Sequence, residues 1–173
     1  MDIKKHITAL GFVPKNGTNG IYHKIYVDYA IEIDFETQSI NYGSAITAES
    51  KTTQNFSQPE NFVMFECVDR LLTKGYKPQN IVLEKTWPSG HGTSGRLDIC
   101  VNREDGTPYM LIECKTFGKE YNKELARIRK DGGQLFTYFQ LSGSKADVLM
   151  LYASELKGNK FVYVNEIIKI EDD

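Results

Sequence analysis

The sequence has few cysteines, no long apolar run and no excess of one charge, and each absence excludes a class of protein. Its three cysteines, Cys67, Cys100 and Cys114, include no CxxC pair, so we expect neither a disulfide framework nor a four-ligand zinc site. Free thiols indicate a reducing, cytoplasmic location. Nowhere do 18 apolar residues follow one another, and MDIKKHITAL lacks the apolar core of a signal peptide, which argues against membrane and secretory proteins.

The charges of the chain are nearly balanced. There are 21 Lys and Arg against 23 Asp and Glu, for a formal net charge of −2. A domain that holds nucleic acid by its overall charge is usually strongly basic. Any binding of nucleic acid must therefore depend on a local positive surface or on another domain. The 173 residues, 40% of them apolar, suffice for one domain with a small appendage.

Residues 1–50 predict a small N-terminal unit. In KKHITALGF, Ile3, Ile7 and Leu10 recur at helical spacing, which predicts a short helix. In residues 20–43 apolar side chains recur at about every second position, with Ile31 and Ile33 on one face. This alternation is typical of half-buried antiparallel strands. The polar residues 51–58 predict a linker.

Residues 59–173 predict a second unit of mixed type. A helix from Pro59 to Gly75 is introduced by Ser57 and Glu60, which match a capping box. Strands follow over 80–87, 96–102 and 108–116, the last two joined by a turn at Asp105-Gly106. A helical segment over 118–141, broken at two glycines, precedes strands over 147–153 and 160–170. We therefore expect an α+β (α/β) fold of order αβββαβ, a mixed sheet flanked by helices.

The residues that indicate chemistry lie on the hairpin. Alternation places Glu113 and Lys115 on one face of LIECK, and the tight connection brings Asp98 of RLDIC beside Glu113. Two carboxylates and the backbone carbonyl of Cys114 offer the oxygen ligands that Mg²⁺ requires, with Mn²⁺ as a substitute. Lys115 is a cation that can prepare the attacking water. This set predicts metal-dependent hydrolysis of a phosphodiester.

Two other E-x-K tripeptides serve as internal controls for this motif. Glu49 has Asp34 at a similar distance upstream, but we expect no strand to hold it. Glu155 follows an apolar run, yet Asp147 is only eight residues back, with no hairpin between them. The simpler alternative for Glu113 itself is an exposed Glu-Lys pair at a strand end.

With GRLDI, MLIECKT, GGQLFTYF and the order of elements, residues 57–153 resemble the PD-(D/E)xK nucleases. Within them, these residues resemble the N-terminal nuclease domain of type I restriction enzyme R subunits and related restriction proteins. The resemblance implies a restriction-endonuclease-like core and a Mg²⁺-dependent endodeoxyribonuclease acting on double-stranded DNA. It also implies motor, methylase and specificity domains or subunits as partners. Leu97 stands where the motif has proline, and the first 50 residues are not covered.

The resemblance also implies accessory site residues, each with a simpler alternative. Glu66 corresponds to the helix carboxylate that binds metal, but equally fits a surface pair with Arg70. Gln134 and Tyr138 correspond to a Q-x-x-x-Y on the next helix. Without the family, Tyr138 reads as a core aromatic and Gln134 as a helix cap. His91 reads as a loop residue, and the glycines around it lack the GK[ST] of a phosphate loop.

A run of cations follows the motif. Such a run is usually a solvated helix face, but beside a metal site it can follow a DNA backbone. The residues that we expect to contact DNA are Lys119, Lys123, Arg127 and Lys130. Two rival functions stay open: a non-catalytic DNA-binding or docking module of the same fold, and a repair or junction-resolving nuclease. The intact acid, acid and lysine set favours an enzyme over the docking module.

Overall fold

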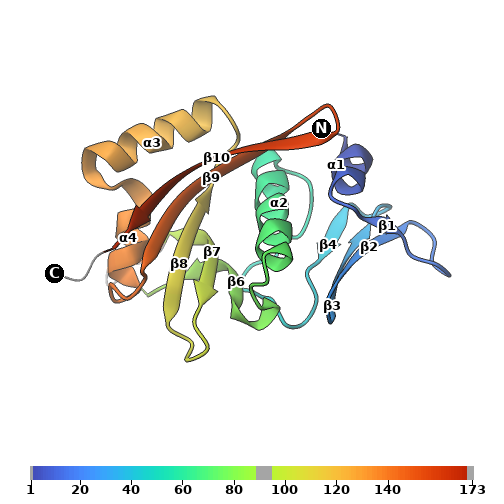
Figure 1. Ribbon diagram of the computed structural model, residues 1–173, viewed down its shortest axis with the longest axis horizontal. Coiled ribbons are helices and arrows are strands. Elements are labelled where there is room, and N and C mark those ends of the chain that lie inside the picture. Colours follow the sequence, from blue (N-terminus) through green and yellow to red (C-terminus); the bar gives the residue numbers. More distant parts are fainter. Residues whose placement is uncertain (1, 89–94, 171–173) are drawn as a thin grey trace.

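The computed structural model describes residues 2–88 and 95–170. These residues form two β-sheets flanked by α-helices (Figure 1), so the expected mixed α+β fold is confirmed. The four helices of the described part are α1 (Ile3–Ala9), α2 (Pro59–Thr73), α3 (Lys119–Asp131) and α4 (Gly133–Leu141). In this part of the chain, no helix has the length and apolar character needed to cross a membrane.

The small sheet is antiparallel throughout, in the order β1-β2-β3-β4. Its strands are β1 (Val13–Pro14), β2 (Ile21–Tyr26), β3 (Tyr29–Asp34) and β4 (Ser39–Asn41). Ile31 and Ile33 of β3 are fully buried, as their alternation predicts. Phe35, just after the strand, is partly exposed.

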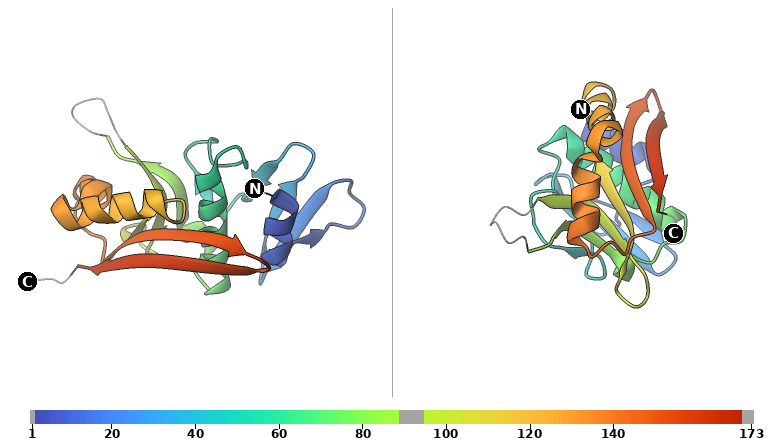
Figure 2. Two further views of the ribbon diagram at one scale, coloured as in Figure 1. Left: turned by 90° about the horizontal axis from the view of Figure 1, so that it is seen from above. Right: turned by 90° about the vertical axis from the view of Figure 1, so that its left-hand side faces the viewer.

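The large sheet is mixed and has the order β10-β9-β8-β7-β6-β5. Its strands are β5 (Thr47–Ala48), β6 (Ile81–Thr86), β7 (Arg96–Asn102), β8 (Pro108–Cys114), β9 (Val148–Lys157) and β10 (Lys160–Lys169). β5 runs parallel to β6 and β8 runs parallel to β9, whereas the other neighbours are antiparallel. Figure 2 shows the long β9–β10 hairpin running along one side of the molecule, where β10 forms an edge.

The large sheet is covered on both faces, because alternate residues of its strands join different cores. Ile112 of β8 packs in one apolar cluster with Phe65 of α2 and residues of the small sheet. Leu111 packs in the other cluster with Ile128 of α3 and Leu135 of α4. Residues 111 and 112 are both fully buried. The three cysteines are free and buried in these cores.

The start of α2 differs from the predicted capping box, which is wrong. The N-cap residue is Gln58, and its side chain makes no capping hydrogen bond. The Ser57 hydroxyl donates instead to Asn55 Oδ1 at 2.5 Å, because the preceding turn holds it away from the helix. The end of α2 agrees with the sequence, since Gly75 takes a left-handed conformation with φ +98°.

The segment 118–141 forms two helices, and the break depends on two glycines. Gly132 is left-handed with φ +87°, and it ends α3 and begins α4. The first amide groups of α4 are capped from α3: Gly133 N donates to Asp131 Oδ1 (3.1 Å) and Gln134 N to Glu124 Oε1 (3.3 Å). Glu124 is almost fully buried, so a carboxylate of one helix fixes the start of the next.

We expect Gly132→Ala to destabilise the protein more than Gly143→Ala. Both glycines are left-handed, so each alanine costs roughly 1–2 kcal/mol of backbone strain. At Gly132 the new Cβ would also overlap the Phe136 side chain, whereas at Gly143 nothing lies within 4 Å. Urea unfolding should therefore show a further loss of about 1–3 kcal/mol for Gly132→Ala. Equal losses at the two positions would contradict the packing assigned to the break.

Candidate active site

The ends of β7 and β8 and the first turn of α2 converge on Asp98 and Glu113. Ile99 of β7 pairs with Ile112 of β8, so continuing this antiparallel register by one residue sets Asp98 opposite Glu113. Asp98 Oδ2 accepts a hydrogen bond from the backbone N–H of Cys114 at 2.7 Å. Asp98 is half-buried and Glu113 is only 4% exposed. The structure thus brings Asp98 and Glu113 together at the end of β8.

Lys115 lies between two carboxylates of this site. Its Nζ atom is 2.9 Å from Glu113 Oε1 and 3.9 Å from Glu60 Oε2. Glu60 is in the first turn of α2, which approaches the end of β8. From the sequence, Glu60 was predicted only as part of a capping box. An acid in the first turn of the helix before the motif was the signal that could have identified it.

The electrostatics of the site are dominated by buried negative charge. Burial raises the pKa of Asp98 well above its usual range, and the nearby Glu113 and Glu60 raise it further. Burial raises the pKa of Glu113 to about 7, although the Lys115 ammonium opposes this shift. Burial alone would lower the pKa of Lys115, but the three surrounding carboxylates raise it overall. One cation therefore faces three acids, so the site favours a further positive charge.

The side chains present fit a divalent cation. Glu113 Oε2 is buried and, among the described residues, has no hydrogen-bond partner, which is unfavourable for a carboxylate oxygen without a ligand. Magnesium is commonly held by one or two carboxylates, with water and substrate oxygens completing its shell. Within residues 2–88 and 95–170, no group of three His, Cys, Asp or Glu is arranged to bind a metal. A cation here would thus be held by Asp98 and Glu113, and the Cys114 carbonyl stays a predicted ligand.

Glu66 belongs to a different cluster. It is only 2% exposed, and its two oxygens accept from the Arg70 guanidinium (2.7 Å) and the Tyr152 hydroxyl (2.6 Å). Glu66 therefore forms the pair with Arg70 that the sequence left open, but this pair is buried on the Glu66 side rather than on the surface. Of the two glutamates on α2, Glu60 is the one that lies beside Lys115.

The structure brings Tyr138 toward the site, whereas the side chain of Gln134 is exposed. The buried Tyr138 hydroxyl donates to the backbone carbonyl of Arg96 (2.9 Å), two residues before Asp98. Burial and the charges of Glu113 and Asp98 raise the pKa of Tyr138. Gln134 is exposed, and among the described residues its side chain makes no hydrogen bond to Lys115. Tyr138 thus anchors the start of β7, and a direct role of Gln134 stays a prediction.

The control tripeptide at Glu49 is better ordered than expected. Glu49 directly follows β5, and its carboxylate accepts from Lys85 Nζ (3.0 Å) and the Thr86 amide (2.8 Å). The expectation that no strand holds Glu49 was wrong, because a two-residue strand is too short to show periodicity. The predicted glycine loop with Gly90, His91 and Gly92 lies outside the described residues, although Gly95 lies within them.

The cations expected to contact DNA share the outer face of α3. The exposed members are Lys119, Lys123, Arg127 and Lys130. Arg127 is 3.4 Å from the capping residue Glu124, and the neighbouring Arg129 pairs with Glu166 of β10 at 3.6 Å. The positive face therefore starts four residues after Lys115 and is presented to solvent.

Comparison with known proteins identifies one family. A family model described as "Type I restriction enzyme R protein N terminus (HSDR_N)" matches residues 59–167, which is more than half of the chain. The match runs from the start of α2 into β10 and includes Glu60, Asp98, Glu113 and Lys115. No curated protein matches the sequence.

We expect the contribution of Glu113 to the free energy of unfolding to fall as pH rises from about 5 to 8 in metal-free buffer. The folded-state pKa of Glu113, about 7, lies above its ordinary value of 4.5. Its stabilising contribution is thus complete below about pH 4.5 and is lost as pH rises through 7, by roughly 3 kcal/mol.

Urea unfolding at a series of pH values measures this loss. The difference in free energy of unfolding between the wild type and Glu113→Gln should fall across this range, whereas the difference between the wild type and Glu36→Gln, at an exposed position, should stay constant. Because Asp98 also has a raised pKa, part of the slope should remain in Glu113→Gln. A difference for Glu113→Gln that does not change with pH would contradict the raised pKa of Glu113.

Proposed function

The chain belongs to the family of the type I restriction enzyme R protein N terminus, and on that basis we propose that it is the nuclease domain of a restriction-modification enzyme. The proposed reaction is Mg²⁺-dependent hydrolysis of phosphodiesters in double-stranded DNA, with a site of the PD-(D/E)xK type. The observation that carries the proposal is the oxygen of Glu113 beside Asp98 that is buried and has no hydrogen-bond partner in the described part of the chain, with Lys115 2.9 Å from the other oxygen. Motor, methylase and specificity functions are assigned to partner domains or subunits.

In the proposed mechanism, Asp98 and Glu113 would hold the metal, with the Cys114 carbonyl as a third protein ligand. Bound Mg²⁺ supplies charge neutralisation at the scissile phosphate and a water of lowered pKa. Asp98 is held for this role by the Cys114 amide, which donates to its Oδ2 atom. The buried position of Glu113 keeps its side chain in one orientation.

Lys115 acts in this mechanism as a cation rather than as a base. Its raised pKa keeps the ammonium protonated at neutral pH, since Glu113, Glu60 and Asp98 all stabilise the charge. A protonated lysine cannot accept the proton of the attacking water. It can orient that water and stabilise the charge that develops on the phosphorane. Glu60 positions the ammonium from the opposite side.

The outer face of α3 is the proposed surface for the DNA backbone. It follows Lys115 directly in the chain, and phosphate contacts from lysine need no sequence-specific geometry. Because the whole chain carries −2, we expect the binding to be weak, steeply dependent on salt and indifferent to sequence.

We expect Asp98→Asn and Lys115→Ala each to reduce Mg²⁺-dependent cleavage by about 100-fold or more while DNA affinity changes little. Both residues serve the transition state rather than the bound substrate. Cleavage of plasmid DNA and gel-shift titration measure the two properties on the same preparations. Reversing Lys123 and Lys130 to Glu is the complementary control, since it should weaken binding to all sequences alike and flatten the salt slope. Equal loss of binding in the site variants would favour the docking module.

We expect Glu60→Gln and Glu66→Gln to separate catalysis from stability. Glu60→Gln removes a partner of Lys115 at a partly exposed position, so cleavage should fall about tenfold or more with little change in stability. Glu66→Gln weakens a buried ion pair with Arg70, so stability should fall by about 1–3 kcal/mol. Thermal unfolding and initial cleavage rates distinguish the two. Loss of stability in Glu60→Gln together with loss of cleavage in Glu66→Gln would instead assign Glu66 to the catalytic site.

A further inference from the structure

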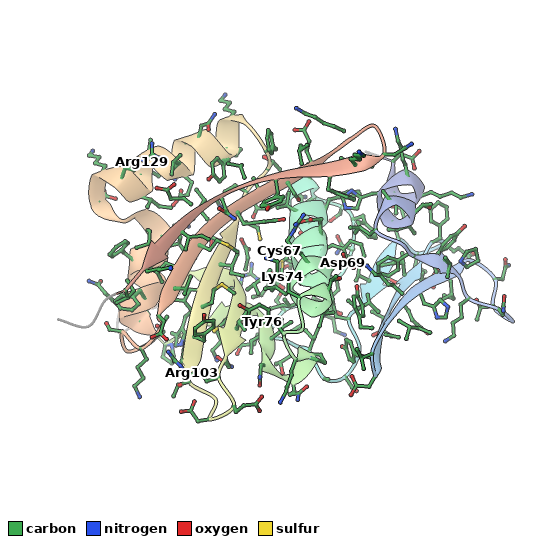
Figure 3. The ribbon with its side chains drawn as sticks, in the orientation of Figure 1. Cys67, Asp69, Lys74, Tyr76, Arg103 and Arg129 are labelled. Atoms are coloured by element: carbon green, nitrogen blue, oxygen red, sulfur yellow. The ribbon has the colours of Figure 1, made fainter. Side chains whose placement is uncertain are left out.

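A second polar and aromatic cleft lies on the other face of the large sheet, at the opposite end of α2. Its cavity of about 270 Å³ lies between α2 and β10 over β8 and β9. Figure 3 shows Cys67, Lys74 and Tyr76 on the side of α2 that faces β8, with Arg103 beside the β7–β8 turn. We call it the tyrosine cleft, defined by Arg70, Lys74, Tyr76, Tyr109, Tyr163 and Lys169.

The cleft is separate from the candidate active site. Glu60 lies in the first turn of α2, and Lys74 follows its last residue. At a rise of 1.5 Å per residue, the two ends of the helix are about 20 Å apart. The candidate acids lie with α3 and α4 on one face of the sheet, whereas the cleft opens on the α2 face. The inner wall of the cleft, at Cys67 and Tyr152, adjoins Cys114 of β8. An inference about the cleft therefore does not depend on the proposed nuclease function.

The walls of the cleft offer aromatic rings for stacking. Tyr163 of β10 is 52% exposed, although its orientation is fixed by two neighbours. The Arg70 guanidinium lies 4.1 Å from the centre of its ring, and Tyr152 is stacked at 6.1 Å with an interplanar angle of 21°. Tyr76 and Tyr109 are half-buried at the end of the cleft. Such a surface favours a flat, aromatic ligand.

The cleft is lined by positive charge, which favours an anionic ligand. Three cations line it, Arg70, Lys74 and Lys169, and no Asp or Glu does. Among the described residues neither lysine forms an ion pair, and Arg70 is bound from behind by the buried Glu66. Charge-assisted hydrogen bonds to phosphate are the usual use of such a group of cations.

The positive charge is confined to the cleft. Just outside it, Lys77 pairs with Glu104 and Arg103 pairs with Asp147, each at 2.7 Å. No continuous basic track therefore leads a nucleic-acid strand across this surface in the described structure. A cavity of about 270 Å³ is also too small for a partner helix, whose diameter with side chains is about 10–12 Å. The size and charge together fit one nucleotide unit.

We propose that the tyrosine cleft binds a free nucleoside monophosphate, with the base stacked on Tyr163 and the phosphate on Lys74 and Lys169. We expect neither half of the ligand to be sufficient alone, because the lining combines aromatic rings with the two lysines.

Isothermal titration of the full chain with adenosine 5′-monophosphate tests the proposal. We expect saturable binding at one site, with adenosine and ribose 5-phosphate each at least tenfold weaker. Tyr163→Ala should weaken binding about tenfold, while Tyr163→Phe, which keeps the ring, should retain it. Tyr163 is half exposed, so the protein should stay folded, which circular dichroism checks.

A matched pair of charge reversals locates the phosphate. Lys169 and Lys160 are exposed at opposite ends of β10, and only Lys169 lines the cleft. Lys169→Glu should weaken nucleotide binding about tenfold or more, whereas Lys160→Glu should leave it unchanged. Absence of saturable binding, or equal effects of the two reversals, would overturn the proposal. Tighter binding of a short single-stranded oligonucleotide, lost in Lys169→Glu, would also overturn it by showing a strand-binding surface.

Discussion

The burial of Asp98 and Glu113 beside each other is the constraint around which the rest of this protein is arranged. Two carboxylates in a low-dielectric position lose hydration and repel each other. Burial raises the pKa of both, and the charge of Glu113 raises that of Asp98 further. Such an arrangement persists only where the surrounding fold imposes it. The β7–β8 hairpin sets the acids opposite each other, and Lys115 offsets part of their charge. The negative charge that Lys115 does not compensate favours a divalent cation.

The helix α2 connects several parts of the molecule that differ in chemistry. Its first turn supplies Glu60 to the hairpin acids, and its middle carries the buried Glu66 and Arg70. Its last turn forms one wall of the tyrosine cleft. Because one rigid helix packs across the sheet, these three groups keep fixed separations. The two proposed sites are therefore placed on opposite faces of the sheet by the same element.

The break between α3 and α4 has a comparable structural role. The left-handed Gly132 turns the chain, and the buried Glu124 caps the helix that follows. This turn lets α4 pack against the sheet so that the Tyr138 hydroxyl reaches the carbonyl of Arg96. The start of β7, and with it Asp98, is thereby held from a second direction. Tyr138 thus supports the site through the backbone.

Local features of the chain were sufficient to predict most of the elements and part of the site. Alternation identified β3, and the Asp105-Gly106 turn with its flanking strands identified the hairpin, which brings Asp98 to Glu113 because only a short connection separates them. Contacts between segments that are far apart in the sequence could not be predicted from these local features. Glu60 reaches Lys115 from another element, and Glu66 finds Tyr152 86 residues away. The contacts of Glu49 with Lys85 and Thr86 of β6 were likewise not predictable from local features. Neither was the tyrosine cleft, whose lining residues come from several elements. Periodicity and turn chemistry act within a few residues, so the sequence by itself determined the elements and the hairpin acids. Only tertiary packing decided which distant side chains would join them.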